Sequence, residues 1–188
     1  MSKEFITFMR NRVSQSLLIT PAPTTVEWTS ILSAACRAPD HGNLKPWRFR
    51  IYEGEGRAKL GQVYWQHALS EVNSIPANKE EAFTKKAFRA PTVLLVYANI
   101  QKHPKVPEIE QVMAVSAATQ QVLLGLSALG YGAIWRSGPA CFTQKTKALL
   151  SLKETDQIVG LIYVGTPKEK PSSIPEVDLE NHLEWVRD

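Results

Sequence analysis

The sequence predicts a single α+β domain in which helices cover both faces of a central sheet. Two unbroken apolar runs of strand length, residues 92–97 and 158–164, indicate strands buried on both faces and therefore the centre of the sheet. Residues 111–135 contain no Asp, Glu, Lys or Arg, which indicates a long helix buried on nearly every side. With 188 residues, no internal repeat and no flexible linker, the chain is expected to form one domain, residues 1–188.

The other elements follow from apolar spacing and from cap and turn residues. Thr24 and Glu27 form a capping-box pattern ahead of an apolar helical face that ends at Pro39. From Trp47 to Tyr52 apolar and basic residues alternate, which predicts a strand with one solvated face. The elements expected in chain order are helices at 4–13, 24–38, 57–72, 79–88, 109–129 and 143–150, and strands at 47–52, 92–97, 131–136 and 158–164. A second subunit is expected to cover part of the uncharged helix, and the tail 171–188 is expected to pack on that partner.

Composition and charge exclude several classes of function. The net charge is +4, but Lys and Arg are scattered and mixed with acids, as in 79–89, so no nucleic-acid-binding stripe is present. The neutral stretch 111–135 contains Gln, Ser and Thr and breaks at a Gly-Tyr-Gly turn, which favours a buried helix over a membrane span. Cys36 and Cys141 lack the spacing of a zinc site and suit a reducing compartment. Residues 1–4 lack the features of a signal peptide, so the expected location is cytoplasmic.

Arg136 is the first charged residue after the neutral stretch. An unpaired charge at the edge of a core costs several kcal/mol, so this guanidinium is expected to meet a carboxylate or a ligand phosphate. Other basic groups also stand at the ends of predicted elements, in segment 10–14, at Arg37 and at Lys168 and Lys170. Each alone would pass as an ordinary solvated charge; together they indicate a common anion.

The loop at 38–47 is dense in polar groups and lies between a helix end and a strand. Three interpretations of it stay open: an Asx-type turn with an exposed histidine, a ligand-binding loop, and a metal site at Asp40 and His41. The metal site is disfavoured because no other histidine has supporting spacing, and no metal is expected.

Four motifs occur in an order that resembles the nitroreductase family, most closely its small, single-domain YdjA-like members. They are Asn-Arg-Val-Ser at 11–14, Arg-Ala-Pro-Asp-His at 37–41 followed by Pro-Trp, Ile-Trp-Arg-Ser-Gly at 134–138, and Gly-Thr-Pro at 165–167. The resemblance runs from about residue 4 to 170 and is specific because the motifs occur together. It implies an α+β fold with a central mixed sheet flanked by helices, in an intertwined homodimer that holds FMN at the subunit interface.

The resemblance also implies which residues bind the flavin. They are Arg12, Val13 and Ser14 at the phosphate and ribityl end, Arg37 and His41 from the Arg-Ala-Pro-Asp-His motif at 37–41, Trp135, Arg136 and Ser137 from the strand, and Lys170 as a further phosphate ligand. No catalytic side chain is expected, because FMN itself performs the redox chemistry.

Two positions depart from the family pattern. The usual second arginine before the serine is Val13, so one contact to the phosphate or ring is missing or comes from elsewhere, for example from Arg10. The usual glutamine before Pro-Trp is Lys45, and a lysine near the flavin pyrimidine would favour the anionic reduced flavin and raise its reduction potential.

The implied reaction is a ping-pong hydride transfer through flavin N5. NAD(P)H is the electron donor, and a small-molecule acceptor such as a nitroaromatic or a quinone then takes its place. One alternative is a flavin-binding carrier or sensor without reductase turnover. Another is a basic interaction module without flavin, against which the scattered charge argues. No nucleic-acid or membrane partner is expected.

Overall fold

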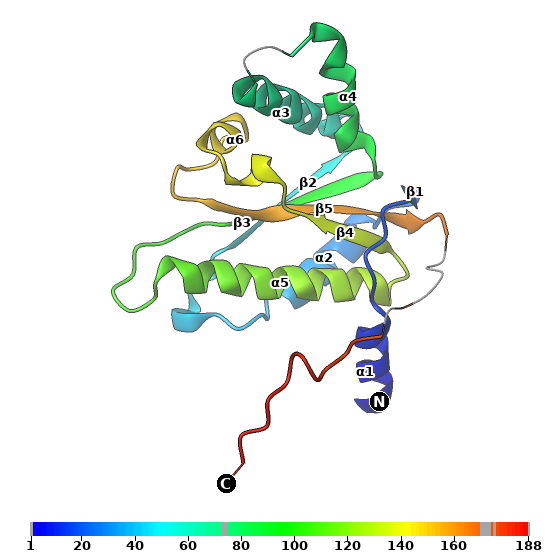
Figure 1. The fold of residues 1–188 in the computed structure, drawn as a ribbon, viewed down its shortest axis with the longest axis vertical. Coiled ribbons are helices and arrows are strands. Elements are labelled where there is room, and N and C mark those ends of the chain that lie inside the picture. The colour runs from blue at the N-terminus through cyan, green and yellow to red at the C-terminus, as the bar shows by residue number, and fades with distance from the viewer. Residues whose placement is uncertain (1, 73–74, 170–173, 175, 188) are drawn as a thin grey trace.

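The computed structural model describes residues 2–72, 75–169, 174 and 176–187 (Figure 1). The helices are α1 (Ser2–Asn11), α2 (Thr25–Ala35), α3 (Gly56–Glu71), α4 (Glu80–Thr84), α5 (Glu108–Ala128) and α6 (Gln144–Leu149). The strands are β1 (Leu18–Ile19), β2 (Trp47–Glu53), β3 (Thr92–Ala98), β4 (Gly132–Arg136) and β5 (Gln157–Pro167). Short 3-10 turns connect them, among them η1 (His41–Asn43), η2 (Ala77–Lys79), η3 (Lys85–Phe88) and η4 (Pro139–Phe142).

The strands form one sheet in the order β1-β5-β3-β2, with β4 paired to β5 beside this path. The two apolar runs therefore lie at the centre of the sheet, as predicted. Every strand pair among the described residues is antiparallel, so the expected mixed sheet is wrong for a single chain. A parallel pairing would need a strand that runs in the same direction as its neighbour, and the described residues supply none.

Helices cover both faces of the sheet, and each face has its own core (Figure 1). Leu94 and Val96 of β3 point into the core shared with α2 and α5. Val93 and Leu95 point into the opposite core, which α3 and α6 cover. This alternation along one fully buried strand explains why its sequence is apolar without interruption.

The capping box that the sequence predicts is present at the start of α2. The Thr24 hydroxyl accepts from the Glu27 N–H at 3.3 Å, and Glu27 Oε2 accepts from the Thr24 N–H at 2.7 Å. The predicted solvated face of β2 is only partly present: Arg48 is exposed, but Tyr52 is buried and the half-buried Arg50 donates to the Leu150 carbonyl at 2.6 Å. The predicted helix at 79–88 is divided into η2, α4 and η3, and β1 was not predicted.

Two segments leave the body of the molecule: α1 at the N-terminus and the C-terminal tail (Figure 1). Large apolar side chains of both are exposed, including Phe5 on α1 and Trp185 in the tail, which is 70% exposed. The outer side of α5 is also exposed and apolar, with Ile109 at 60% and Met113 at 62% exposure. The predicted burial of this helix on every side is thus not complete within one chain. No described helix combines the length and apolar character that crossing a membrane requires.

Candidate functional site

The edge strand β4 connects two cavities of the chain. One of its edges pairs with β5, and on the other edge the Gln15 N–H donates to the Ala133 carbonyl at 3.0 Å. Backbone groups of residues two apart point to the same edge of a strand. The peptide groups of Trp135 therefore face the outer edge, where no described strand covers them.

The first cavity, which we call the Arg12 cavity, lies at the start of β4. It has a volume of about 210 Å³ and is lined by residues that include Arg12, Val13, Gln15, Tyr131 and Pro167. No carboxylate among the described residues lies within ion-pair distance of the Arg12 guanidinium.

Gly132 brings the N-terminal segment close enough to β4 to form this cavity. A Cβ at this position would lie 2.6 Å from Gln15 Oε1 and 2.9 Å from Leu18 Cδ2 and Pro167 Cγ. Any larger residue would push residues 15–18 away from the strand. The glycine thus positions Arg12 beside β4.

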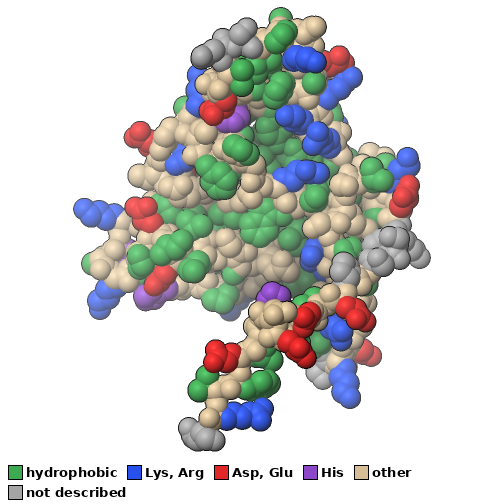
Figure 2. Space-filling model, viewed as in Figure 1, with side chains coloured by type: hydrophobic (Ala, Val, Ile, Leu, Met, Phe, Trp, Pro, Cys, Tyr) green, Lys and Arg blue, Asp and Glu red, His purple; other side chains and the backbone are tan. Residues whose placement is uncertain are grey.

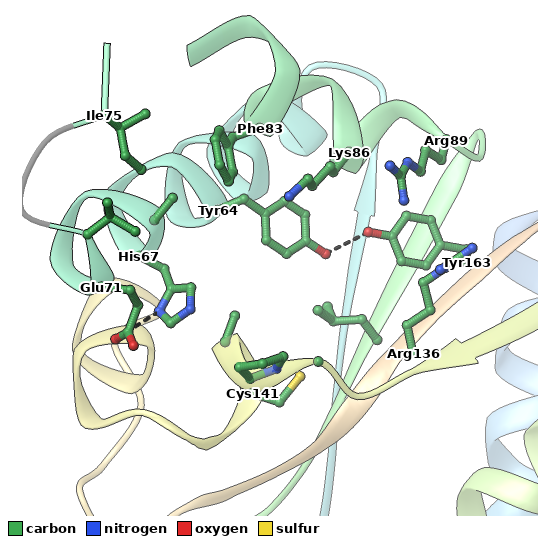
Figure 3. Close-up of a pocket in the computed structure, with 16 residues that line it drawn as sticks. Tyr64, His67, Glu71, Ile75, Phe83, Lys86, Arg89, Arg136, Cys141 and Tyr163 are labelled. Carbon is green, nitrogen blue, oxygen red and sulfur yellow. Dashed lines mark hydrogen bonds and ion pairs between the residues drawn. The ribbon is translucent and has the colours of Figure 1, made fainter. Parts of the chain in front are cut away.

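The second cavity, which we call the α3–β4 cavity, lies at the end of β4 and measures about 510 Å³. It is enclosed by α3, α4, η3, η4 and the centre of β5, and three cations line it: Lys86, Arg89 and Arg136 (Figure 3). Figure 2 shows several Lys and Arg side chains around largely hydrophobic surface on this side of the molecule. Arg136 is exposed in the single chain, so the expected burial of this charge does not occur without a partner or a ligand.

Two tyrosines meet at the inner wall of the α3–β4 cavity. The hydroxyl oxygens of Tyr64 on α3 and Tyr163 on β5 lie 2.6 Å apart (Figure 3). Burial raises the pKa of both phenols; for Tyr163 the hydrogen bond with Tyr64 and the charges of Arg89 and Arg136 partly offset this rise. Both hydroxyls are consequently protonated at neutral pH and able to donate a hydrogen bond.

The sequence indicated none of Lys86, Arg89, Tyr64 and Tyr163 as site residues. The two tyrosines are 99 positions apart in sequence, so only the fold pairs them. The one available signal was the spacing of the two cations, three positions apart after a helix, which places them on the same side.

The side chain of Trp135 points away from both cavities. Its indole packs in the core on the α5 side of the sheet, and Nε1 donates to the Val159 carbonyl at 3.1 Å. A contact between this residue and a ligand at the outer edge of β4 would therefore come from its backbone. Arg136, the next residue, projects to the opposite face and lines the α3–β4 cavity.

The structure does not bring Arg37 and His41 to either cavity. Arg37 is exposed just after α2, and His41 is exposed and paired with Glu110 in the first turn of α5. The Arg12 cavity includes Ser127 at the opposite end of the same helix. At 1.5 Å per residue, the two ends are about 25 Å apart along the helix axis.

The remaining predicted site residues are less informative. Ser14 and Ser137 are exposed and flank the segments that line the two cavities, and Lys170 lies outside the described residues. In the 38–47 loop the Lys45 N–H donates to Asp40 Oδ2 at 2.6 Å, a bond that spans five residues and so is longer than an Asx turn, and His41 is exposed. No group of three or more metal-ligating side chains occurs in the described part of the chain.

The model of the nitroreductase family matches residues 12–166. This chain belongs to the nitroreductase family. It is 38% identical over 167 residues to an Escherichia coli (strain K12) protein provisionally named NAD(P)H nitroreductase YdjA, with 87% of this chain and 88% of that protein covered. A Haemophilus influenzae protein, provisionally named an NAD(P)H nitroreductase, is 32% identical over 166 residues, with 88% of this chain and 89% of that protein covered.

Solved structures of the family share the fold. The nitroreductase-like family protein from Bacillus cereus has a TM-score of 0.83 at 20% identity and covers 97% of this chain and 96% of its own. The FMN-dependent nitroreductase NfnB from Mycobacterium smegmatis, solved in complex with NADPH, has a TM-score of 0.76 at 15% identity and covers 99% of both chains. The α+β fold expected from the motifs is confirmed.

Proposed function

We propose that the chain is an FMN-dependent oxidoreductase that uses NAD(P)H to reduce nitroaromatic, quinone or similar electron-poor acceptors. The observation that carries the proposal is that β4 runs from one cavity to the other. Its outer edge beyond Ala133 joins the Arg12 cavity to the α3–β4 cavity, and each cavity is lined by a guanidinium, Arg12 or Arg136, that no carboxylate of the described residues pairs. The relatives' names, NAD(P)H nitroreductase for YdjA and FMN-dependent nitroreductase for NfnB, support the same reaction class.

The residues along β4 fit FMN. Arg12 would hold the phosphate, since a guanidinium binds phosphate through paired donors, and the Ser14 hydroxyl would add a donor. The outer-edge peptide groups of Trp135 would hydrogen-bond the polar edge of the ring, and Arg136 would lie beside it. When bound, FMN supplies the two-electron chemistry, taking hydride from NAD(P)H and passing it to the acceptor. The chain positions both reactants and needs no nucleophile or general base of its own.

The site is proposed to be completed by a second copy of this chain. His41, which pairs with Glu110, lies about 25 Å from the Arg12 cavity along α5, too far to share a phosphate or ring with it, and Arg37 lines neither cavity. Their predicted role in flavin binding therefore requires Arg37 and His41 of the partner subunit. The exposed apolar side of α5 and the apolar side chains of the tail supply surface for such a homodimer, because apolar patches of this kind mark interfaces.

The test is the visible spectrum of the purified protein, followed by anaerobic addition of NADPH and then of NADH. The expected result is a yellow protein that releases FMN on denaturation, bleaches with one or both nucleotides and regains colour when a nitroaromatic is added. A yellow protein that neither nucleotide bleaches would favour a flavin carrier or sensor. A colourless protein that ignores added FMN would overturn the proposal.

A variant connects this test to the structure. Arg12→Ala removes the charge of the Arg12 cavity and is expected to weaken FMN binding by on the order of tenfold to a hundredfold. Lys59→Ala is the matched control, because this lysine is exposed on α3 and lines neither cavity. Equal FMN affinity in the two variants would remove Arg12 from the site.

A further inference from the structure

The α3–β4 cavity carries positive charge that no described side chain neutralises. Lys86, Arg89 and Arg136 line it, and no carboxylate among the described residues lies within ion-pair distance of any of them. Instead, Lys86 Nζ lies 4.1 Å from the centroid of the Phe83 ring, and Arg136 Cζ lies 5.8 Å from that of Tyr163. Desolvation, and after it the charge of Arg89, lowers the pKa of Lys86, so Arg89 disfavours the charged form of Lys86. A bound anion would relieve this repulsion.

The neighbouring Lys85 shows what an ordinary surface lysine does in the same segment. It is exposed and forms an ion pair with Glu81 at 2.6 Å. Lys86, the next residue, is half-buried, and its chain turns toward the cavity (Figure 3). The two adjacent lysines therefore differ: Lys85 lies on the surface in an ion pair, whereas Lys86 lines the cavity without an ion pair to a described carboxylate.

The cavity is polarised along its length. Among the described residues the one carboxylate that lines it is that of Glu71, which lies beside His67 at the end away from Arg89 and Arg136 (Figure 3). The rest of the lining is mainly apolar and includes Ala68, Val72, Ile75, Phe83 and Leu161. A ligand that suits this cavity has an apolar body and a negative group at the end near the cations.

The tyrosine pair adds a neutral donor at the cationic end. Of the two hydroxyl hydrogens, one is used between Tyr64 and Tyr163, and the other is free for a ligand oxygen. Guanidinium groups and a phenol together match the two oxygens of a carboxylate, for which the planar guanidinium provides parallel donors.

We propose that the α3–β4 cavity binds the electron acceptor, and that Lys86, Arg89 and Arg136 select acceptors whose planar apolar body carries a carboxylate. This inference rests on the proposed function, because it names the acceptor class of that same site. The volume of about 510 Å³ suits a small aromatic molecule. The 2′-phosphate of NADPH is a poorer match, because it is attached to a polar ribose that the apolar walls would desolvate without compensation.

The test compares two acceptors of nearly the same shape, 4-nitrobenzoate and its neutral isostere 4-nitrobenzamide, with the FMN-loaded protein. The wild type is expected to reduce the benzoate with the higher kcat/KM. Arg89→Gln and Lys86→Met are each expected to lower the benzoate-to-benzamide ratio by on the order of tenfold, with the benzamide little changed. The methionine keeps the contact of the lysine stem with Phe83, and a thermal melt of each variant confirms folding.

Lys85→Gln is the control, since it removes a lysine from the adjacent position outside the cavity; its ratio is expected to stay within about twofold of the wild type. The proposal is overturned if the wild type does not prefer the benzoate, or if Arg89→Gln leaves the ratio unchanged. If Arg89→Gln or Lys86→Met shifts the flavin midpoint potential but leaves the benzoate-to-benzamide ratio unchanged, the cations interact with the flavin and not with the acceptor. A variant that raises the KM for NADPH but not for NADH would assign them to the 2′-phosphate. Either result also overturns the proposal.

A binding measurement separates this proposal from the proposed function. Calorimetric titration of 4-nitrobenzoate into the FMN-loaded protein needs no turnover. If neither nucleotide bleaches the flavin, but the benzoate binds and Arg89→Gln weakens it by on the order of tenfold, the anion site stands while the reductase function fails. If a nucleotide bleaches the flavin but 4-nitrobenzoate binds no more tightly than 4-nitrobenzamide, the reductase function stands and the anion site fails.

Discussion

Gly160 of β5 is the position where the sheet leaves room for Trp135, and its replacement by alanine is expected to disturb fold and site together. A Cβ on residue 160 would lie 2.1 Å from Trp135 Nε1 and 2.5 Å from Cδ1, whereas non-bonded carbon contacts are favourable at about 3.5 to 4.0 Å. The indole must therefore retreat by about 1 Å or more, which breaks its 3.1 Å hydrogen bond to the Val159 carbonyl. A buried hydrogen bond contributes about 1 kcal/mol, and overpacking costs about 1 to 3 kcal/mol.

Gly160→Ala is thus expected to lower the free energy of unfolding by about 2 to 4 kcal/mol. For a domain of this length the corresponding fall in Tm is about 5 to 15 °C. The assay is thermal and urea unfolding followed by circular dichroism at one fixed protein concentration, because dimerisation would make Tm depend on concentration. Since Arg136 follows Trp135 directly, the FMN affinity of the folded variant is expected to fall as well.

Two comparisons make this prediction refutable. Gly56→Ala is the control, because a Cβ there meets no atom within 4 Å, and its effect is expected to stay within about 1 kcal/mol. Trp135→Leu removes the indole, so Gly160→Ala should cost much less in that background. The reasoning is refuted if Gly160→Ala unfolds at the wild-type temperature, or if it costs the same with and without the indole.

Three further predictions concern the interface, the flavin and the thiols. Met113→Glu, a charge on the exposed side of α5, is expected to convert a dimer into folded monomers in sedimentation velocity, whereas Met113→Gln should change the assembly less. Lys45→Gln is expected to lower the flavin midpoint potential by on the order of 10 to 30 mV, and an unchanged potential would remove Lys45 from the flavin environment. Because burial raises the thiol pKa of Cys36 and Cys141, both should react with iodoacetamide more slowly than free cysteine at pH 8, and faster as pH rises; equal rates would contradict this.

The centre of the sheet was predictable because a strand that is buried on both faces has an uninterrupted apolar sequence. Strands β3 and β5 have apolar runs without interruption, and α2 carries a capping box that the structure reproduces. The solvated face predicted for β2 holds at Arg48 but not at Arg50, whose charged group donates to the Leu150 carbonyl, 100 positions away in sequence. Alternation of polar and apolar residues marks the two sides of a strand; it does not reveal that a distant segment provides a partner for the polar side.

The candidate site was predictable in part for a related reason. The motifs identified Arg12 and Arg136 as candidates, but only the fold brings the segment after α1 beside the start of β4, the strand that ends at Arg136. Lys86 and Arg89 were hidden in a mixed-charge segment that resembles any solvated surface. What distinguishes them is the missing carboxylate, since Glu81 is used by Lys85, and a missing partner becomes visible only in three dimensions.

The exposure of Arg136 also changes the physical argument for a ligand. A buried, unpaired guanidinium would require an anion in every state, but an exposed one is solvated in the single chain and requires an anion only when something covers it. If a second subunit closes over the flavin site, dimerisation desolvates the cations of β4 and FMN compensates them. The two equilibria are then coupled: FMN strengthens the dimer by the same factor by which the dimer strengthens FMN binding. Removing FMN should therefore raise the dimer dissociation constant, and Met113→Glu should weaken FMN binding although Met113 lines neither cavity.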